Sequence, residues 1–325
     1  METIALGYGH GDRVTRRAVA ASNRVYWMVG AGCAVAVIAA TLYWRERSTT
    51  PATLMSRLPA SSAAVLGVDF QALRRAGILD LLAGATVEEE AEYKTFLAKT
   101  GFDYRRDLDF AVAAFDAGAT FMLVRGRFDW KKLESYAKDQ GGGCFNALCR
   151  MAGSRPERKI SYFPLRSSLM ALAVSPDDFA ASRLNESGHS QGALTIPAEP
   201  VWLRLTPAAL KNTDGLPPGT QLFAKAMSEA ENVLLSLGAA PQSGGGFEAR
   251  IEVTCRSEQD ASTLHASLDK ITHVLREMIA KEKQKPNPAD LSGVLTAGQF
   301  RRESRKVLGR WPIERAFLES LAGRS

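Results

Sequence analysis

The chain has 325 residues, of which 46% are hydrophobic and 23% are charged. These proportions argue against a disordered, collagen-like or wholly membrane-embedded protein. The net charge of +6 suits a nucleic-acid or membrane-surface partner but is too small to require one. Four cysteines in this length exclude a disulfide-dense scaffold.

One stretch near the N-terminus is long and apolar enough to cross a bilayer. Residues 25–44 (VYWMVGAGCAVAVIAATLYW) contain no charged side chain, and about 20 apolar residues span a hydrocarbon core as a helix. Tyr26 and Trp27 lie at one end, and Tyr43 and Trp44 at the other. Aromatic rings at both ends are typical of membrane–water interfaces. The run predicts a transmembrane helix, and its bulky end favours an uncleaved anchor.

Arginines flank this span unevenly. Four precede it, in residues 1–24, and three follow it, in residues 45–60. Because cytoplasmic segments carry the excess of Lys and Arg, we expect 1–24 to be a cytoplasmic tail. Residues 45–60 contain prolines and no periodicity, which predicts a linker. The rest of the chain is then expected outside the cytoplasm, with the protein in the cell inner membrane.

Residues 61–190 carry the signals of a first α+β unit. Short apolar runs separated by turn residues indicate strands, and Asp116-Ala117-Gly118 is typical of a hairpin turn. Strands are predicted over 63–70, 108–115, 120–127, 148–152, 159–163 and 169–174, and helices over 87–99, 129–138 and 176–184.

Residues 191–325 repeat this order. Strands are predicted over 201–205, 232–237, 247–255 and 300–308, with helices after 206 and 257 and a last helix from Pro312. Leu73 and Leu210, which end similar strand–turn segments, are 137 residues apart. Pro176 and Pro312, which each open a predicted helix, are 136 residues apart. The near-equal separations indicate a diverged tandem duplication.

Consecutive strands joined by short turns imply antiparallel pairing, with helices covering one face of the sheet. The predicted fold class is therefore α+β. It comprises an N-terminal transmembrane helix and two diverged tandem units, 61–190 and 191–325, of mainly antiparallel sheet with helices on one face.

A short motif lies within the first unit. Residues 101–108 (GFDYRRDL) precede two apolar strands, and residues 125–129 (RGRFD) follow them. This pattern resembles uncharacterised bacterial proteins that carry an N-terminal membrane segment and an exported α+β domain. The resemblance implies envelope localisation and brings no activity. The same residues also suit a structural role, since Asp103 and Asp107 favour turns and helix caps.

Cys144 and Cys149 are separated by four residues in a glycine-rich stretch. In an oxidising compartment they can form a local disulfide that closes a short loop. Two free thiols are the main alternative. A metal site needs further ligands and no histidine lies nearby, while a redox pair more usually has two intervening residues.

Basic side chains gather near the C-terminus, in FRRESRKVLGR. They are Arg301, Arg302, Arg305, Lys306 and Arg310. On an edge strand such charges can simply prevent aggregation. Alternatively they form a patch for an anionic ligand, either anionic lipid or an acidic envelope polymer. An exported domain does not meet nucleic acid, so we expect no nucleic-acid partner.

No assembled catalytic set is visible in the sequence. It lacks the P-loop and G-x-G-x-x-G dinucleotide motifs. His265 and His273 share a predicted helix but are eight residues apart, whereas a metal pair needs three or four. We therefore predict no catalytic residue, metal or cofactor.

The predicted function is a non-catalytic binding or scaffolding role in the envelope. The expected partners are the lipid bilayer, through 25–44, and an envelope protein or an anionic lipid or polymer. The alternative is an unrecognised envelope enzyme of the hydrolase class, because active sites converge from distant positions.

Overall fold

The structure is a computed structural model. It describes residues 51–59, 63–79, 91–116, 118–153, 155, 157–186, 196–211, 218–240 and 246–322. The predicted tail 1–24 and transmembrane helix 25–44 lie outside these ranges. Within them, no helix combines the length and the apolar character that crossing a bilayer requires. Residues 54–325 form one compact unit, which contains the fold.

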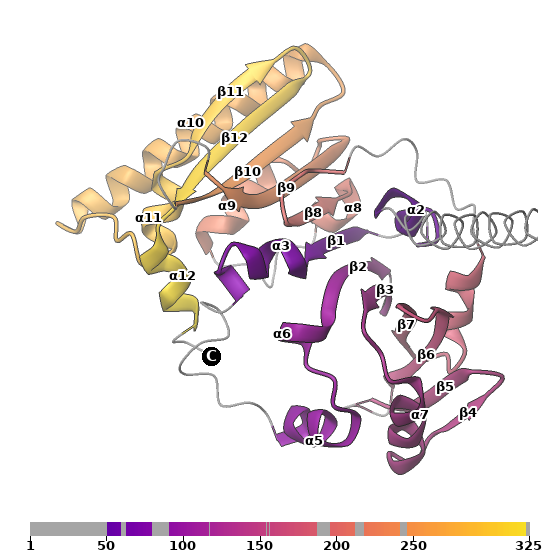
Figure 1. Cartoon of the computed structure of the whole chain (residues 1–325). Coiled ribbons are helices and arrows are strands. Elements are labelled where there is room, and N and C mark those ends of the chain that lie inside the picture. The colour runs from indigo at the N-terminus through magenta and orange to yellow at the C-terminus, as the bar shows by residue number, and fades with distance from the viewer. Residues whose placement is uncertain are drawn as a thin grey trace, which may run out of the picture. The chain divides into compact units, whose positions relative to one another are not determined.

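In the described residues, twelve strands form one sheet in which all neighbours are antiparallel (Figure 1). The strands are β1 Ala64–Asp69, β2 Leu108–Asp116, β3 Ala119–Gly126, β4 Gly143–Phe145, β5 Leu148–Ala152, β6 Lys159–Arg166, β7 Leu169–Ser175, β8 Val201–Leu205, β9 Asn232–Ala239, β10 Phe247–Thr254, β11 Gln299–Glu303 and β12 Lys306–Ile313. The helices are α2 Pro51–Met55, α3 Phe70–Arg75, α5 Ala91–Thr100, α6 Tyr104–Asp107, α7 Trp130–Asp139, η1 Ala180–Asn185, α8 Pro207–Lys211, α9 Pro218–Ala226, α10 Glu258–Lys281, α11 Leu291–Thr296 and α12 Arg315–Ala322. The fold is thus α+β with a large antiparallel sheet, as the sequence predicts.

The sheet has an N-terminal half and a C-terminal half that meet at its centre. From the centre outward, the N-terminal half runs β1-β2-β3-β7-β6-β5-β4 and the C-terminal half runs β8-β9-β10-β12-β11. β1 pairs with β8, so that Ala64 lies opposite Leu205 and Val68 opposite Val201. The first five strands of each half occupy equivalent positions, and the two predicted units share one continuous sheet.

Polar residues begin several of the helices. The side chains of Asp69, Asp129, Ser257 and Asp290 accept hydrogen bonds from backbone N–H groups in the first turns of α3, α7, α10 and α11. Such caps satisfy donors that the helix itself leaves unpaired. These helices therefore begin where the sequence supplies a short polar side chain.

Alternate residues of each strand point to opposite faces of the sheet. We call face A the side toward which Val124 and Ile251 point, and face B the side toward which Leu123 and Arg250 point. On face A, α7 packs on the N-terminal half through Leu133. Helices α8, α9 and α10 and the partly buried side chains of α11 pack on the C-terminal half, and α10 runs along β11 and β12 (Figure 1).

Face B differs between the halves. In the N-terminal half it is covered by Leu54, Met55 and Leu58, and by Ala181 and its neighbours in η1. In the C-terminal half, the described helices that pack on the sheet belong to the face A cluster. The last helix, α12, lies beside the segment before α11, where Ser320 Oγ donates a hydrogen bond to the carbonyl of Ala289 (2.6 Å).

One row of directly opposed residues across face B shows the difference between the two halves. The row is Gln299, Arg310, Arg250, Ser236, Trp202, Gly67, Val112, Leu123, Ala171 and Phe163. The first four residues are polar or charged and belong to β9–β12, and the remainder are apolar. Face B therefore changes from polar to apolar near the centre of the sheet.

Two sequence predictions are wrong in the N-terminal half. Helices do not cover one face only, since η1, α2 and Leu58 pack on face B. The predicted linker 45–60 contains α2, and Leu54 and Leu58 are fully buried in the core. Proline and small polar residues obscured this segment, whose apolar side chains are too few to show a helical period.

Two further predictions are wrong near the C-terminus. The single predicted strand 300–308 is a hairpin of β11 and β12, with Ser304 at a positive φ of 51° in the turn. Pro312 lies in β12 instead of opening a helix. β11 pairs with β12 only as far as Arg310, so Pro312 lies where β12 is an edge strand, a position that tolerates a residue without an N–H.

Candidate binding surface on the C-terminal half

Face B of the C-terminal half forms a hollow of about 870 Å³. Its floor consists of polar and charged side chains from β9, β10 and β12 together with Leu234 and Leu308, and Arg204 from β8 and Gln299 from β11 also line it. Glu199, from the segment before β8, adds a further wall. Side chains of five strands thus converge on one open surface.

The predicted basic patch is only partly brought together on this surface. Arg301, Lys306 and Arg310 line the hollow. Arg302 lies opposite Val307, whose side chain is buried on face A, so Arg302 extends from the other side of the sheet. Arg305 lies in the turn between β11 and β12, where its Nη1 donates to the carbonyl of Arg256 (3.4 Å).

The lining carries five basic and three acidic side chains. The basic ones are Arg204, Arg250, Arg301, Lys306 and Arg310, and the acidic ones are Glu199, Glu248 and Glu252. The lining therefore has an excess of two positive charges. Glu303, beside the hollow, pairs with Arg301 at 3.2 Å and lowers this excess to one.

Arg250 is the centre of an ion-pair network on this surface. Its Nε donates to Glu248 Oε1 (2.6 Å), and its Nη1 donates to Glu199 Oε1. The hydrogen bond to Glu248 raises the pKa of the Arg250 guanidinium and, together with the bond to Glu199, outweighs the opposite effect of burial. The network ties β10 to the segment before β8, which are far apart in the sequence.

Two arginines of the hollow are hydrogen-bonded to neutral amides. Arg310 donates from Nε (3.0 Å) and Nη2 (2.7 Å) to Gln299 Oε1. Arg204 donates from Nε to Asn232 Oδ1 (2.9 Å), and burial lowers the pKa of its guanidinium. Arginine nevertheless stays charged in proteins, so both side chains contribute a positive charge that their amide partners do not neutralise.

The chemistry of the lining suits binding. Each of its carboxylates is paired with a cation, Glu199 and Glu248 with Arg250 and Glu252 with Lys306. Among the described lining residues, Ser236 supplies the single hydroxyl, and neither Cys nor His is present. In the described parts of the chain, no three His, Cys, Asp or Glu side chains gather as a metal site would require.

Sequence reasoning missed Arg204, Arg250 and their acidic neighbours. A signal was present in β10, where Glu248, Arg250 and Glu252 alternate with Ala249 and Ile251. This alternation shows a strand with one charged face. It does not show which other strands would extend that face.

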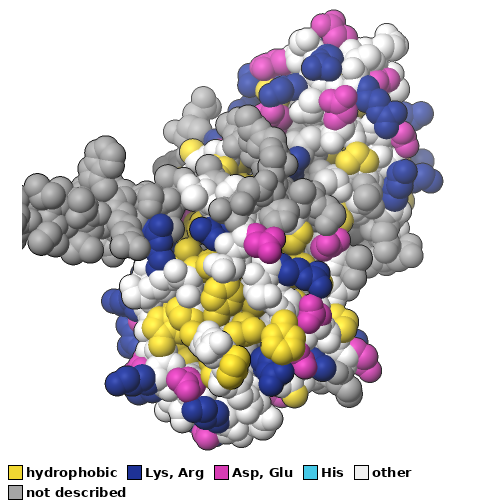
Figure 2. All heavy atoms as spheres, turned by 90° about the vertical axis from the view of Figure 1, so that its right-hand side faces the viewer, with side chains coloured by type: hydrophobic (Ala, Val, Ile, Leu, Met, Phe, Trp, Pro, Cys, Tyr) yellow, Lys and Arg dark blue, Asp and Glu magenta, His cyan; other side chains and the backbone are white. Residues whose placement is uncertain are grey.

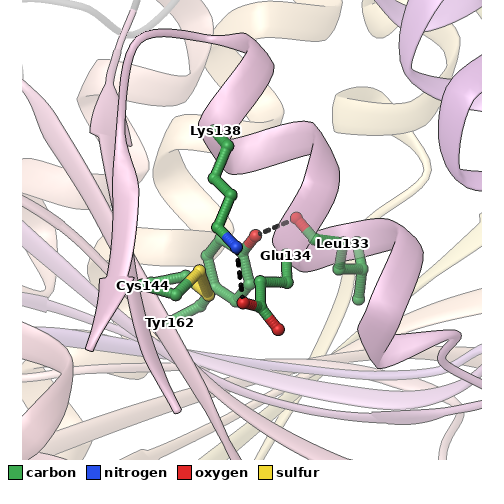
Figure 3. The surroundings of a disulfide bond; sticks show 6 residues. Leu133, Glu134, Lys138, Cys144 and Tyr162 are labelled. Carbon is green, nitrogen blue, oxygen red and sulfur yellow. Dashed lines mark hydrogen bonds and ion pairs between the residues drawn. A yellow bond between two sulfur atoms is a disulfide. The ribbon is translucent and has the colours of Figure 1, made fainter. Parts of the chain in front are cut away.

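Cys144 and Cys149 are joined by a disulfide (Figure 3). They are directly opposed in the hairpin of β4 and β5. The hairpin lies beneath α7, where Leu133 and the buried Cys149 belong to one apolar cluster. The hydroxyl of Tyr162 donates to the carbonyl of Leu133 (2.6 Å) and ties β6 to the same helix. The disulfide thus belongs to the packing of the N-terminal half.

A second hollow, of about 820 Å³, lies on face A of the N-terminal half between α5, α7 and the sheet. Its walls are mainly apolar and include several aromatic rings, with Phe96 packed on Tyr136 (5.2 Å between ring centroids) and Phe102 on Phe128 (5.4 Å). Figure 2 shows hydrophobic side chains gathered at the level of this half, with Lys and Arg side chains around them. Among the described residues that line it, Glu92 is the one charged side chain.

Comparison with known proteins gives a similarity in fold. No protein-family model and no curated sequence matches the chain. Among solved structures, crystal form III of TP0453 is similar at 10% identity and a TM-score of 0.46, covering 83% of this chain and 97% of TP0453. Forms IV and I give TM-scores of 0.45 and 0.46 at 10% identity, covering 81% and 83% of this chain and 93% and 96% of TP0453. These values describe a distant similarity in fold, from which no binding or activity follows.

Proposed function

We propose that this protein is a membrane-anchored envelope protein with a non-catalytic binding or scaffolding role, and that face B of the C-terminal half is its binding surface. In this proposal residues 25–44 cross the inner membrane and residues 1–24 form a cytoplasmic tail. The remainder lies outside the cytoplasm. Its partner there is an envelope protein or an anionic lipid or polymer.

The observation that carries the proposal is the different covering of face B in the two halves. In the N-terminal half η1 packs on an apolar face. In the C-terminal half the equivalent face is charged and forms a hollow. A charged surface of this size suits a polar partner. Its exposed polar groups can exchange bound water for hydrogen bonds to the partner, and groups that the partner buries need such bonds.

We also propose that the two halves arose by tandem duplication. The shared strand order β1-β2-β3-β7-β6 and β8-β9-β10-β12-β11 supports this origin. In the described residues, face B is covered in the first copy and exposed in the second, so the two copies diverged after the duplication. The binding surface then belongs to the second copy alone.

The location is tested with an alkaline phosphatase fusion placed after Ser325 of the full chain. This reporter is active only outside the cytoplasm, so we expect activity in intact cells. A matched fusion placed within residues 1–24 should be inactive. Activity of the N-terminal fusion alone would reverse the orientation and overturn the proposed location.

The binding surface is tested by crosslinking in membranes that contain the full chain. Ser236 lines the hollow opposite Arg250, so Ser236→Tyr should abolish the crosslinked species by steric block. Ser262→Tyr, on the exposed side of α10, is the matched control and should retain it. Identical species in both variants would contradict the assignment of the surface. Release of a cleaved product from the captured partner would instead support the hydrolase alternative.

A further inference from the structure

The outer two strands of the open surface place two arginines on neighbouring positions. Gln299 lies opposite Arg310, and Arg301 lies opposite Leu308. Arg301 and Arg310 are therefore diagonal neighbours on face B, a separation that long side chains can bridge. Both residues are exposed and both line the hollow.

The partners of these arginines leave their donors available. Gln299 accepts two hydrogen bonds from Arg310 through one neutral oxygen, so the charge of Arg310 is not neutralised. Arg301 pairs with Glu303, but their side chains are 72% and 55% exposed. An ion pair this exposed contributes little stability and is easily exchanged. An anion can therefore take the place of the Gln299 oxygen at Arg310 and of the Glu303 carboxylate at Arg301 at small cost.

Two guanidinium groups on separate strands favour an anion that has several oxygens. A carboxylate offers two oxygens, both in one plane. A phosphate group has more terminal oxygens in a tetrahedral arrangement, so it can accept from two guanidinium groups on separate strands. Gln299 lies opposite Arg310 and two residues before Arg301 on β11, and its amide N–H₂ supplies a further donor.

We propose that Arg301, Arg310 and Gln299 bind a phosphate group of the partner. This inference rests on the proposed function, because it names the chemistry that the same surface recognises. Lys306 adds a nearby positive charge, although its ammonium pairs with Glu252. The phosphate belongs either to a soluble envelope component or to a lipid headgroup, and the test separates these sources.

The test uses the full chain in phosphatidylcholine nanodiscs. Glycerol phosphate is titrated and followed by ³¹P NMR, and vesicles containing phosphatidylglycerol are tested separately by co-flotation. We expect Arg310→Gln to weaken binding of the recognised source about tenfold, since it removes a charge-assisted fork. Arg310→Lys keeps the charge but not the fork, so its affinity should lie between those of the wild type and of Arg310→Gln.

Arg302→Gln is the matched control. It removes the same charge from the same hairpin, but on the opposite side of the sheet, and it should leave binding unchanged. If the protein binds glycerol phosphate, the vesicles or both, and Arg310→Gln weakens that binding, the result supports the site and identifies the source. Equal weakening by Arg302→Gln, or binding to neither probe, overturns it. If only this test fails while Ser236→Tyr still abolishes crosslinking, the proposed function stands without the phosphate site.

Discussion

Asp107 shows how a single residue of the 101–108 motif holds local structure. Its side chain is only 11% exposed. It accepts hydrogen bonds from the backbone N–H of Asp103 (2.9 Å), from Arg106 and from Arg127 Nη2 (3.0 Å). The backbone joins the same contact, since the N–H of Arg127 donates to the carbonyl of Asp107 (2.9 Å). These bonds fasten the turn of α6 to the end of β3.

Protonation of Asp107 should weaken this contact. Burial alone would raise the pKa of the Asp107 carboxyl, but the hydrogen bond from Arg106, that from Asp103 and the charge of Arg127 together hold it below the usual 3.8. A carboxyl whose pKa is lower in the folded state stabilises the protein at pH values above its pKa in the unfolded state. This stabilisation is lost as the pH falls through the pKa in the folded state. The stability from Asp107 is therefore full at neutral pH and disappears in acid.

We predict that Asp107→Asn lowers the free energy of unfolding at pH 7 by about 1–3 kcal/mol, because charged hydrogen bonds at a buried site are lost. It should also flatten the acid limb of a urea-unfolding series measured against pH. Asp139→Asn is the matched control, since Asp139 pairs with Lys99 on the surface, where both side chains are more than 40% exposed. Equal effects of the two substitutions would show that Asp107 adds nothing beyond a surface charge.

At the scale of elements, the β4–β5 hairpin combines a tight turn with a covalent link. Asn146 and Ala147 both have positive φ, 46° and 66°. This backbone matches a two-residue hairpin turn whose twist follows that of the strands. The turn brings Cys144 opposite Cys149. The sequence spacing predicted a possible pair, and the left-handed turn supplies its geometry.

We predict that the disulfide contributes about 2 kcal/mol to stability, since it closes a short loop in the unfolded chain. Cys144→Ala/Cys149→Ala should lose this amount in urea unfolding, and reductant should lower the wild type by the same amount. Reductant should leave the double variant unchanged, which is the control. Alkylation of both cysteines in denatured, unreduced protein would refute the bond.

At the scale of the whole molecule, the two halves are joined by the pairing of β1 with β8. Gly67 lies opposite Trp202, a residue that is 3% exposed and whose ring packs over the glycine. A Cβ at position 67 would overlap the indole ring. A glycine at this position lets a large aromatic side chain close the joint between the halves.

We predict that Gly67→Ala lowers the free energy of unfolding by about 1–3 kcal/mol through overpacking. Gly143→Ala is the control, because Gly143 is also in a strand and an added Cβ there has open space. Trp202→Leu should recover part of the loss in the double variant, which a double-mutant cycle measures. Equal stabilities of the two glycine variants would show that the joint tolerates a larger side chain.

Several features of the fold are predictable from local pattern. The predicted strands 108–115, 120–127 and 159–163 coincide closely with β2, β3 and the start of β6. The strand at 300–308 was misjudged because the Ser304 turn carries no glycine or proline signal. The prediction that helices cover one face of the sheet is wrong because alternation along a strand shows that it has two faces but not what packs on each one.

The sequence by itself determined the α+β class, the hairpin of β2 and β3 and the clustering of basic residues near the C-terminus. It predicts a membrane span at 25–44, which lies outside the described residues. Only the tertiary structure decided that Arg301, Lys306 and Arg310 share a face with Arg250 while Arg302 and Arg305 do not. The physical reason is that alternation fixes which residues of one strand point together, whereas the register between distant strands decides which charges meet.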